Sequence, residues 1–237
     1  MAKFIHEGDQ KKKYVKQMFN DISSTYDIIN IISSFGIDRY WRYKLVNKIK
    51  MNSGQKLLDV ATGTGDVAFG FLKKYDIKVI GLDIAKKMIS IARNKAKKHS
   101  KNIEFIVGDA EKLSFEKKSF DALTISFGFR NIGTYDKALS EFHRVLDNNG
   151  KIAILEFSKP TSKWFSPIFE FYFKKIIPLI GSILSRKDAY LYLPESVDYF
   201  LERKDVCDKM KKAGFSNVSY TDFTFGVVTL YTGEKVE

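Results

Sequence analysis

Short apolar runs alternate with amphipathic stretches along most of this chain. The apolar runs have the length of strands and lie at residues 56–61, 78–83, 103–108, 120–127 and 150–157. Helical patterns separate them at residues 66–75, 85–99 and 135–146. Such alternation is typical of a parallel sheet with helices on both faces. We therefore predict a doubly wound α/β fold.

The two ends of the chain follow other patterns. Residues 10–50 predict helices that are interrupted at Ser33–Gly36 and form an N-terminal helical cap. Residues 162–202, after the fifth strand, predict an aromatic and mostly helical insert. Two final strands near 217–223 and 226–233 are joined by a very short connection, so they must be antiparallel.

The candidate chemistry starts at the turn after the first strand. Residues 59–66 place Gly63 and Gly65 between a strand and a helix, where a backbone without Cβ atoms can approach a ligand closely. The second strand ends at Asp83, about 20 residues further on, which is the offset at which such folds bind a ribose. Together these features predict a bound nucleoside.

The same turn also satisfies the dinucleotide pattern G-x-G-x-x-G/A, so the type of nucleoside must be decided by charge. Asp59 and Asp66 flank the turn, and carboxylates would repel a pyrophosphate that needs bare amides there. S-adenosylmethionine has no phosphate and carries two cationic groups. A third acid, Asp109, follows the third strand beside the Ala110 amide and suits an adenine amino group. The acids therefore favour S-adenosylmethionine, although aspartate is also common in turns.

The order of motifs resembles that of class I S-adenosylmethionine methyltransferases, and in particular the quinone-biosynthesis C-methyltransferases of the UbiE/MenG family. The segments that carry the resemblance are residues 19–27, 33–37, 41–42, 61–66, 124–131, 155–160 and 225–228. It extends over roughly residues 13–233, with one departure at residues 148–150, where Asn-Asn-Gly replaces the usual Pro-Gly-Gly.

The resemblance implies a mostly parallel seven-stranded sheet whose last strand inserts antiparallel beside the fifth. It also implies cofactor contacts from the turn and from the ends of the following strands. The candidate cofactor-binding residues are Asp59, Gly63, Thr64, Gly65, Asp83, Asp109, Ala110 and Ser126.

The implied substrate is a prenylated hydroquinone that is methylated on a ring carbon. Resemblance at residues 61–66 and 224–228 favours demethylmenaquinol as the acceptor, which gives menaquinol. A 2-polyprenyl-6-methoxy-benzoquinol of ubiquinone biosynthesis is the alternative. The aromatic insert, which includes Trp164, Phe169 and Phe173, would suit a polyprenyl tail, although helices that are apolar on several sides are also common in protein cores.

Carbon methylation requires an acceptor ring whose hydroxyl loses its proton. Arg130 follows the fourth strand and stays protonated, so we expect it to hold the phenolate or a water molecule rather than to act as a base. Asn131 would orient that water, and Tyr26 of the cap would complete the network. The alternative is that Arg130 and Asn131 cap the next helix or pair with Asp136.

Length and composition agree with one soluble α/β domain, and the resemblance implies that residues 1–237 form a single methyltransferase domain. The single cysteine, Cys207, fits a reducing compartment, and no secretory signal or metal-ligand cluster is visible, so we expect a cytoplasmic protein without a metal. The net charge of +12 fits peripheral contact with an anionic membrane, and equally a lysine-rich composition.

Two other classes of enzyme stay open on the sequence alone. The positive charge would suit a nucleic-acid methyltransferase, but residues 126–129 lack the Pro-Pro-Tyr/Phe type of motif and no stacking basic segment is present, so we expect no nucleic-acid partner. A nicotinamide-dependent reductase is disfavoured by the acids beside Gly63 and Gly65. The sequence leaves a homo-oligomer open.

Overall fold

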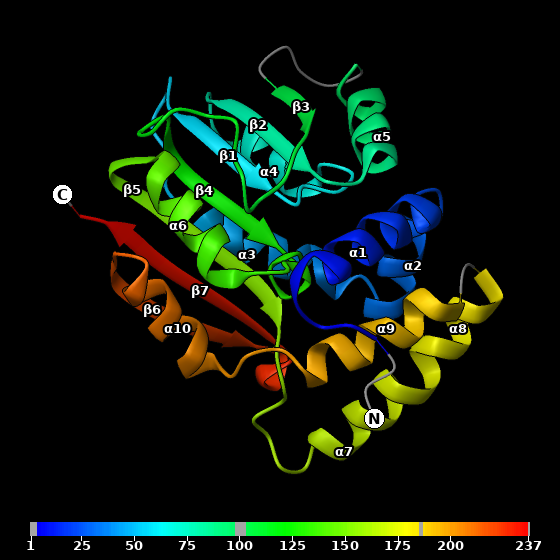
Figure 1. Cartoon of the computed structure of the whole chain (residues 1–237). Coiled ribbons are helices and arrows are strands. Elements are labelled where there is room, and N and C mark those ends of the chain that lie inside the picture. Colours follow the sequence, from blue (N-terminus) through cyan, green and yellow to red (C-terminus); the bar gives the residue numbers. More distant parts are fainter. Residues whose placement is uncertain (1–3, 98–102, 185–186, 237) are drawn as a thin grey trace.

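The computed structural model describes residues 4–97, 103–184 and 187–236, and these contain a seven-stranded sheet in the order β3-β2-β1-β4-β5-β7-β6 (Figure 1). The strands are β1 (Lys56–Val60), β2 (Lys78–Asp83), β3 (Ile103–Val107), β4 (Phe120–Ser126), β5 (Leu146–Phe157), β6 (Phe215–Phe223) and β7 (Val228–Lys235). Neighbouring strands are parallel except that β7 is antiparallel to both β5 and β6. The predicted doubly wound, mostly parallel sheet with its antiparallel last strand is confirmed.

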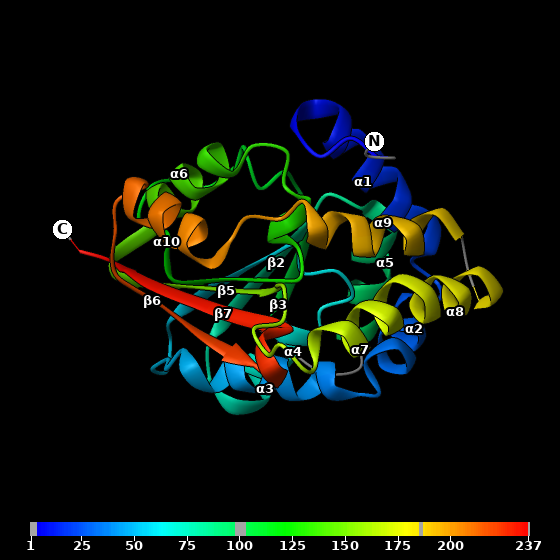
Figure 2. The same cartoon turned by 90° about the horizontal axis from the view of Figure 1, so that it is seen from below.

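Helices cover both faces of the sheet (Figure 2). On one face lie α6 (Tyr135–Val145) and α10 (Arg203–Lys212), and on the other lie α3 (Ile37–Lys48), α4 (Asp66–Lys74) and α5 (Lys86–Ala96). Helix α6 shows why: Ala138, Leu139, Phe142 and Val145 recur at helical spacing and are fully buried against the strands. The sheet is therefore apolar on both faces, as its strand sequences predict.

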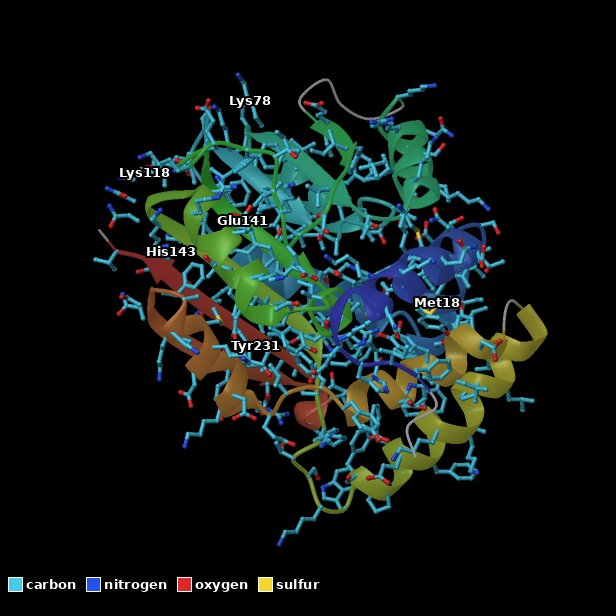
Figure 3. The ribbon with its side chains drawn as sticks, in the orientation of Figure 1. Met18, Lys78, Lys118, Glu141, His143 and Tyr231 are labelled. Atoms are coloured by element: carbon cyan, nitrogen blue, oxygen red, sulfur yellow. The ribbon has the colours of Figure 1, made fainter. Side chains whose placement is uncertain are left out.

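Two helical segments meet beyond the carboxyl ends of the parallel strands. The N-terminal cap contributes α1 (Gly8–Ile22) and α2 (Tyr26–Ser34). The insert consists of α7 (Ser166–Phe171), the π-helical turn η2 (Tyr172–Ile176), α8 (Ile177–Leu184) and α9 (Lys187–Asp198). Met18, Ile22 and Ile29 of the cap share one core cluster with Phe173, Ile177 and Tyr192 of the insert, and Figure 3 shows Met18 on this side of the molecule. Within the described residues, no helix is both long enough and apolar enough to cross a bilayer.

Most observed boundaries differ from the predicted ones by a few residues, and the end of the helix predicted over 85–99 lies outside the described residues. Two departures are larger. The cap has a second interruption at residues 23–25, where the hydroxyls of Ser23 and Thr25 bond to the carbonyls of Asn20 and Ile22 and compete with helix continuation. Strand β5 begins at Leu146 rather than at residue 150. Its pairing with β4 jumps from Leu146 to Lys151, so the residues between them bulge out, with Asn149 at a φ of 62°.

A buried lysine fastens α1 to the body of the protein. The side chain of Lys11 is only 2% exposed, and its ammonium donates to the carbonyl oxygens of Arg130 (2.7 Å) and Ile132 (2.9 Å). Burial, helped by the positive charge of Arg130, lowers the pKa of Lys11 to about 8. The folded state therefore loses this proton more readily than the unfolded chain does.

This shift predicts a pH-dependent stability that Lys11→Met should abolish. Between pH of about 8 and 10.5 the unfolded chain binds the extra proton, so the stability of the wild type relative to Lys11→Met should rise with pH, by at most about 3 kcal/mol. Urea unfolding of both proteins across this range measures the difference. Lys13→Met, which removes an exposed lysine from the same helix, is the control. A stability difference that does not change with pH would contradict the assignment.

Candidate active site

The turn between β1 and α4 adopts backbone angles that glycine tolerates without strain. Gly63 and Gly65 have φ values of 56° and 93°, in the left-handed region that other residues avoid. A Cβ on Gly65 would also lie 2.7 Å from the ring of Phe105 and 2.9 Å from that of Phe69. A Cβ on Gly63 would meet only the ring of Tyr26, at 3.8 Å, so the Gly63 backbone has open space in which to face a ligand.

A small cavity of about 80 Å³ lies next to this turn, at the carboxyl ends of β1, β2, β3 and β4. Five of the predicted cofactor-binding residues line it: Gly63, Asp83, Asp109, Ala110 and Ser126. The three others, Asp59, Thr64 and Gly65, are not among its described lining residues. The structure therefore brings together predicted residues from the carboxyl ends of four strands, whereas Asp59, Thr64 and Gly65 belong to the strand end and turn beside the cavity.

Asp83 has the geometry of a buried hydrogen-bond acceptor. It is 8% exposed, and its two oxygens accept the backbone N–H groups of Gly63 (2.9 Å) and Ala85 (2.8 Å). Burial raises its pKa, while these backbone hydrogen bonds oppose the shift. The hydroxyl of Ser126, at the end of β4, is buried and has no hydrogen-bond partner in the described part of the chain. Both side chains can accept or donate further hydrogen bonds toward the small cavity.

Asp59 and Thr64 support the turn instead. Asp59 is 1% exposed and accepts the hydroxyls of Thr62 (2.6 Å) and Thr124 (2.8 Å); burial raises its pKa to about 6, against these hydrogen bonds. The Thr64 hydroxyl donates to Asp27 of α2 at 2.7 Å, and Lys95 of α5 bonds both residues. The sequence predicts direct ligand contacts from both side chains, whereas the structure engages both in contacts within the protein.

Helix α1 closes one side of the small cavity through residues that the sequence did not single out. Lys12 forms ion pairs with Asp109 (2.9 Å) and Glu111 (3.3 Å), and all three line the cavity. Glu111 also accepts the backbone N–H groups of Gly133 and Thr134. A lysine run on a helix is ordinarily solvated, so only the fold reveals this contact.

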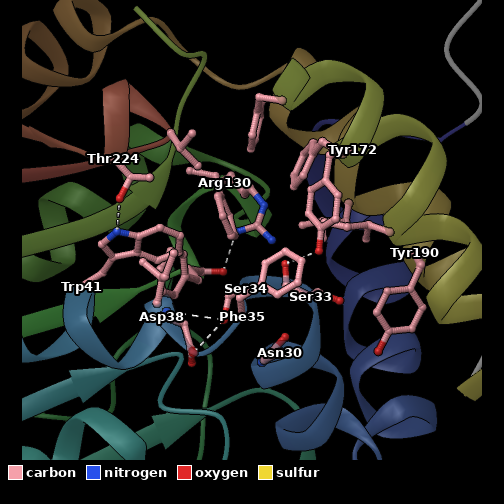
Figure 4. A pocket seen from close by; sticks show the side chains of 18 of the residues that line it. Asn30, Ser33, Ser34, Phe35, Asp38, Trp41, Arg130, Tyr172, Tyr190 and Thr224 are labelled. Atoms are coloured by element: carbon pink, nitrogen blue, oxygen red, sulfur yellow. Dashed lines mark hydrogen bonds between the residues drawn. The ribbon is translucent and has the colours of Figure 1, made fainter. Parts of the chain in front are cut away.

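A second and larger cavity, of about 380 Å³, lies between the cap and the insert (Figure 4). Its walls are mainly apolar and aromatic and include Met18, Ile22, Trp41, Phe157, Phe165, Phe169, Phe173 and Ile177. Phe19, Tyr26 and Phe127 line both cavities, so the two adjoin at these side chains. Burial raises the pKa of Tyr26 and keeps its phenol protonated, although the charge of Arg42 opposes the shift.

Arg130 lines the larger cavity and is 6% exposed. Its Nη1 donates to Glu156 (2.5 Å) and to the Phe127 carbonyl (2.8 Å), and its Nε donates to the hydroxyl of Ser196 (3.2 Å). The other guanidinium nitrogen, Nη2, has no partner among the described residues. Figure 4 shows this guanidinium surrounded by cap and insert side chains, so a free donor faces the cavity.

The partners of Arg130 correct one alternative drawn from the sequence. Asp136 pairs with Lys209 at 2.8 Å, not with Arg130. Glu156, which is fully buried in β5, is the true partner, and in the sequence it stands out only as part of the segment at residues 155–160. Asn131 lines the small cavity, and its Oδ1 accepts the hydroxyl of Tyr192 at 3.1 Å. Tyr26, Arg130 and Asn131 therefore do converge at the junction of the cavities.

Comparison with known proteins agrees with this architecture. The family model described as the ubiE/COQ5 methyltransferase family matches residues 7–235. A ubiquinone/menaquinone biosynthesis C-methyltransferase UbiE of Citrifermentans bemidjiense is 44% identical over 230 residues, which are 95% of this chain and 98% of that protein. A demethylmenaquinone methyltransferase of Bacteroides fragilis is 40% identical over 232 residues, covering 95% and 94% of the two chains.

A solved structure supports the fold at lower identity. Phosphoethanolamine N-methyltransferase 2 of Haemonchus contortus, in complex with S-adenosyl-L-methionine, superposes with a TM-score of 0.63 at 17% identity, covering 81% of this chain and 51% of that one. The resemblance inferred from the motifs is thereby confirmed, and the chain belongs to the ubiE/COQ5 methyltransferase family.

Proposed function

We propose that this enzyme transfers the methyl group of S-adenosylmethionine to a ring carbon of a prenylated hydroquinone, with demethylmenaquinol as its acceptor. The observation that carries the proposal is the junction of two unlike cavities. The small one is lined by acids and backbone at the strand ends, and the large one is aromatic and apolar. A polar cofactor and a greasy acceptor would thus meet beside Tyr26 and Phe127.

The acids of the small cavity fit S-adenosylmethionine. A carboxylate offers about four lone-pair sites, and Asp83 uses two of them for backbone N–H groups that fix its orientation. The remaining sites can accept both ribose hydroxyls. Asp109 and the amide of Ala110 line the same cavity and would bind the adenine edge, and the Ser126 hydroxyl, which has no partner among the described residues, would add a donor there.

The large cavity contributes the chemistry of the acceptor. S-adenosylmethionine would supply an electrophilic methyl group. As the ring hydroxyl loses its proton, the adjacent ring carbon would become nucleophilic and form a bond to the methyl carbon while the bond from that carbon to sulfur breaks, with S-adenosylhomocysteine as the leaving group. The hydrogen on the methylated ring carbon would then leave to solvent as a proton and restore the aromatic ring. Arg130 stabilises the phenolate through its free Nη2. Glu156 and Ser196 hold the guanidinium in a fixed orientation, so this donor is already in position when the negative charge develops. Asn131, held by Tyr192, and Tyr26 orient the acceptor or a water molecule beside it.

The ring choice rests on the relatives and on the resemblance. The Bacteroides fragilis relative is named for demethylmenaquinone, while the UbiE relatives are named for both quinones. The aromatic walls formed by Trp41, Phe127 and Phe157 suit a two-ring naphthoquinol, which presents more surface for stacking than a benzoquinol. Peripheral contact with the inner face of an anionic membrane is part of this proposal.

The function is tested by offering the purified enzyme labelled S-adenosylmethionine together with either a membrane lipid extract or RNA. We expect label in the quinone fraction of the lipid extract and none in RNA. Label in RNA alone would support a nucleic-acid methyltransferase and contradict the proposal.

The cofactor assignment predicts that Asp83→Ala weakens binding of S-adenosylmethionine by about 2–3 kcal/mol, because charge-assisted hydrogen bonds to the ribose are lost. Calorimetric titration measures the change, and circular dichroism checks that the variant is folded. Asp208→Ala, at an exposed position on α10, is the matched control. Unchanged affinity in a folded Asp83→Ala protein would end the assignment.

The role of Arg130 predicts that Arg130→Leu lowers turnover by about 100-fold or more, on the scale of a lost oxyanion donor, while cofactor affinity barely changes. The single variant leaves Glu156 buried without its cation, which is costly to stability. The double variant Arg130→Leu/Glu156→Gln removes that unpaired charge and should show the same loss of turnover. A double variant with near wild-type turnover, or with intact turnover and weakened cofactor binding, would refute the role.

A further inference from the structure

Exposed large apolar side chains gather around the mouth of the larger cavity. Phe35, Ile37 and Ile168 line the cavity and are also exposed, at 78%, 40% and 59%. Ring contacts join their surroundings: Phe35 lies 5.6 Å from Tyr172, and Trp164 lies 5.3 Å from Phe225. Isolated exposed apolar residues are ordinary, but a group that surrounds a cavity mouth marks an interaction site.

Three segments build this surface, which we call the mouth face. It consists of Ile28, Ile32, Phe35, Ile37, Trp164, Ile168, Phe171 and Phe225. Trp164, Ile168 and Phe171 recur at helical spacing and form one stripe along the start of the insert. Helices α2 and α8 lie side by side in Figures 1 and 2, and α7 leads into α8 through η2. Tyr172 of η2 donates to the Ser33 carbonyl of α2 at 3.1 Å and so joins the cap to the insert.

Basic side chains border the mouth face. Lys163, directly before Trp164, and Lys175, four residues after Phe171, are both exposed. An interfacial tryptophan with flanking lysines is typical of proteins that rest on a bilayer. Each basic residue near an anionic surface adds about 1 kcal/mol of attraction.

The size of the larger cavity indicates what the mouth face contacts. Its volume of about 380 Å³ lies at the lower end of the range of about 300–1,000 Å³ for small-molecule sites. A quinol ring and the beginning of a tail would fill it, so the rest of a polyprenyl chain must leave through the mouth. In water that chain would expose a large apolar surface, whereas in a bilayer it stays in its own medium.

We infer that the mouth face docks on an anionic lipid bilayer, so that the larger cavity opens directly into the lipid and the acceptor ring enters without crossing water. The inference rests on the proposed function for the nature of the acceptor. The net charge of the chain does not show which surface would contact a membrane, and this inference assigns that contact to the residues of the mouth face.

The test uses the double variant Trp164→Glu/Phe171→Glu, whose residues are exposed and do not line the larger cavity. Tyr220→Glu/Val236→Glu introduces the same charge on two other exposed residues, one in the edge strand β6 and one directly after β7, and is the matched control. Co-sedimentation with vesicles of phosphatidylglycerol and phosphatidylcholine measures binding. Methyl transfer is measured on a tailless demethylnaphthoquinol in solution and on a long-tailed one held in the vesicles.

The mouth-face variant should lose vesicle binding and vesicle-dependent turnover by at least about tenfold, and keep wild-type turnover on the tailless acceptor within about twofold. The control should match the wild type in all assays. Wild-type binding and vesicle turnover in Trp164→Glu/Phe171→Glu would overturn the inference. The inference would also be overturned if the wild type formed a dimer, bound no vesicles, and became a monomer on Trp164→Glu/Phe171→Glu substitution. The mouth face would then be the interface between two copies of the chain. Failure of the wild type on both acceptors, with vesicle binding intact, would refute the proposed function but not the docking.

The basic border has its own pair of variants. Lys163→Glu/Lys175→Glu should bind anionic vesicles more weakly than Lys211→Glu/Lys212→Glu, which makes the same charge change on α10. Wild-type binding should fall as salt is added and as the fraction of anionic lipid is reduced. Equal binding to neutral and anionic vesicles would overturn the electrostatic part of the docking.

Discussion

The buried ion pair between Arg130 and Glu156 is the interaction on which the arrangement of the site depends. Glu156 is fully buried, and its carboxylate accepts both the guanidinium and the backbone N–H of Arg130. The ends of β4 and β5 are thereby held together. The same short segment receives Ser196 of the insert and, through its carbonyl oxygens, Lys11 of the cap. Cap, insert and sheet therefore converge on one pair of charges.

Burying such a pair is costly unless its donors and acceptors form hydrogen bonds, and nearly all the donors and acceptors of Arg130 and Glu156 do so. The one guanidinium nitrogen without a partner among the described residues is Nη2, on a side chain that lines the larger cavity. The positive charge of Arg130 also helps to lower the pKa of Lys11. The pairing with Glu156 offsets the cost of burying Arg130, and it leaves one donor that, in the proposed mechanism, would bind the developing phenolate.

Much of the fold follows from the sequence because strands and helices have different periods. The parallel strands were predictable from apolar runs, and Asp83, Asp109 and Ser126 were predictable as neighbours because parallel strands end at one edge.

The contacts of Lys11 and Lys12 were not predictable, since a lysine run resembles a solvated helix face and only the docking of α1 buries it. Glu156 was hidden in an apolar strand, because its partner depends on the register of β4 and β5. Thr64 is not among the residues that line the small cavity, and its hydroxyl bonds to Asp27 and Lys95, which no local sequence pattern shows.

In the proposed reaction, a methyl group passes from sulfur to a ring carbon of a naphthoquinol at the junction of the two cavities. The most direct test supplies S-adenosylmethionine labelled with ¹³C in its methyl group, together with short-tailed, reduced naphthoquinol and benzoquinol acceptors, and locates the label by NMR. We expect a new carbon–carbon bond on the naphthoquinol ring and a higher kcat/KM for that acceptor. Label on a hydroxyl oxygen, or a clear preference for the benzoquinol, would contradict it.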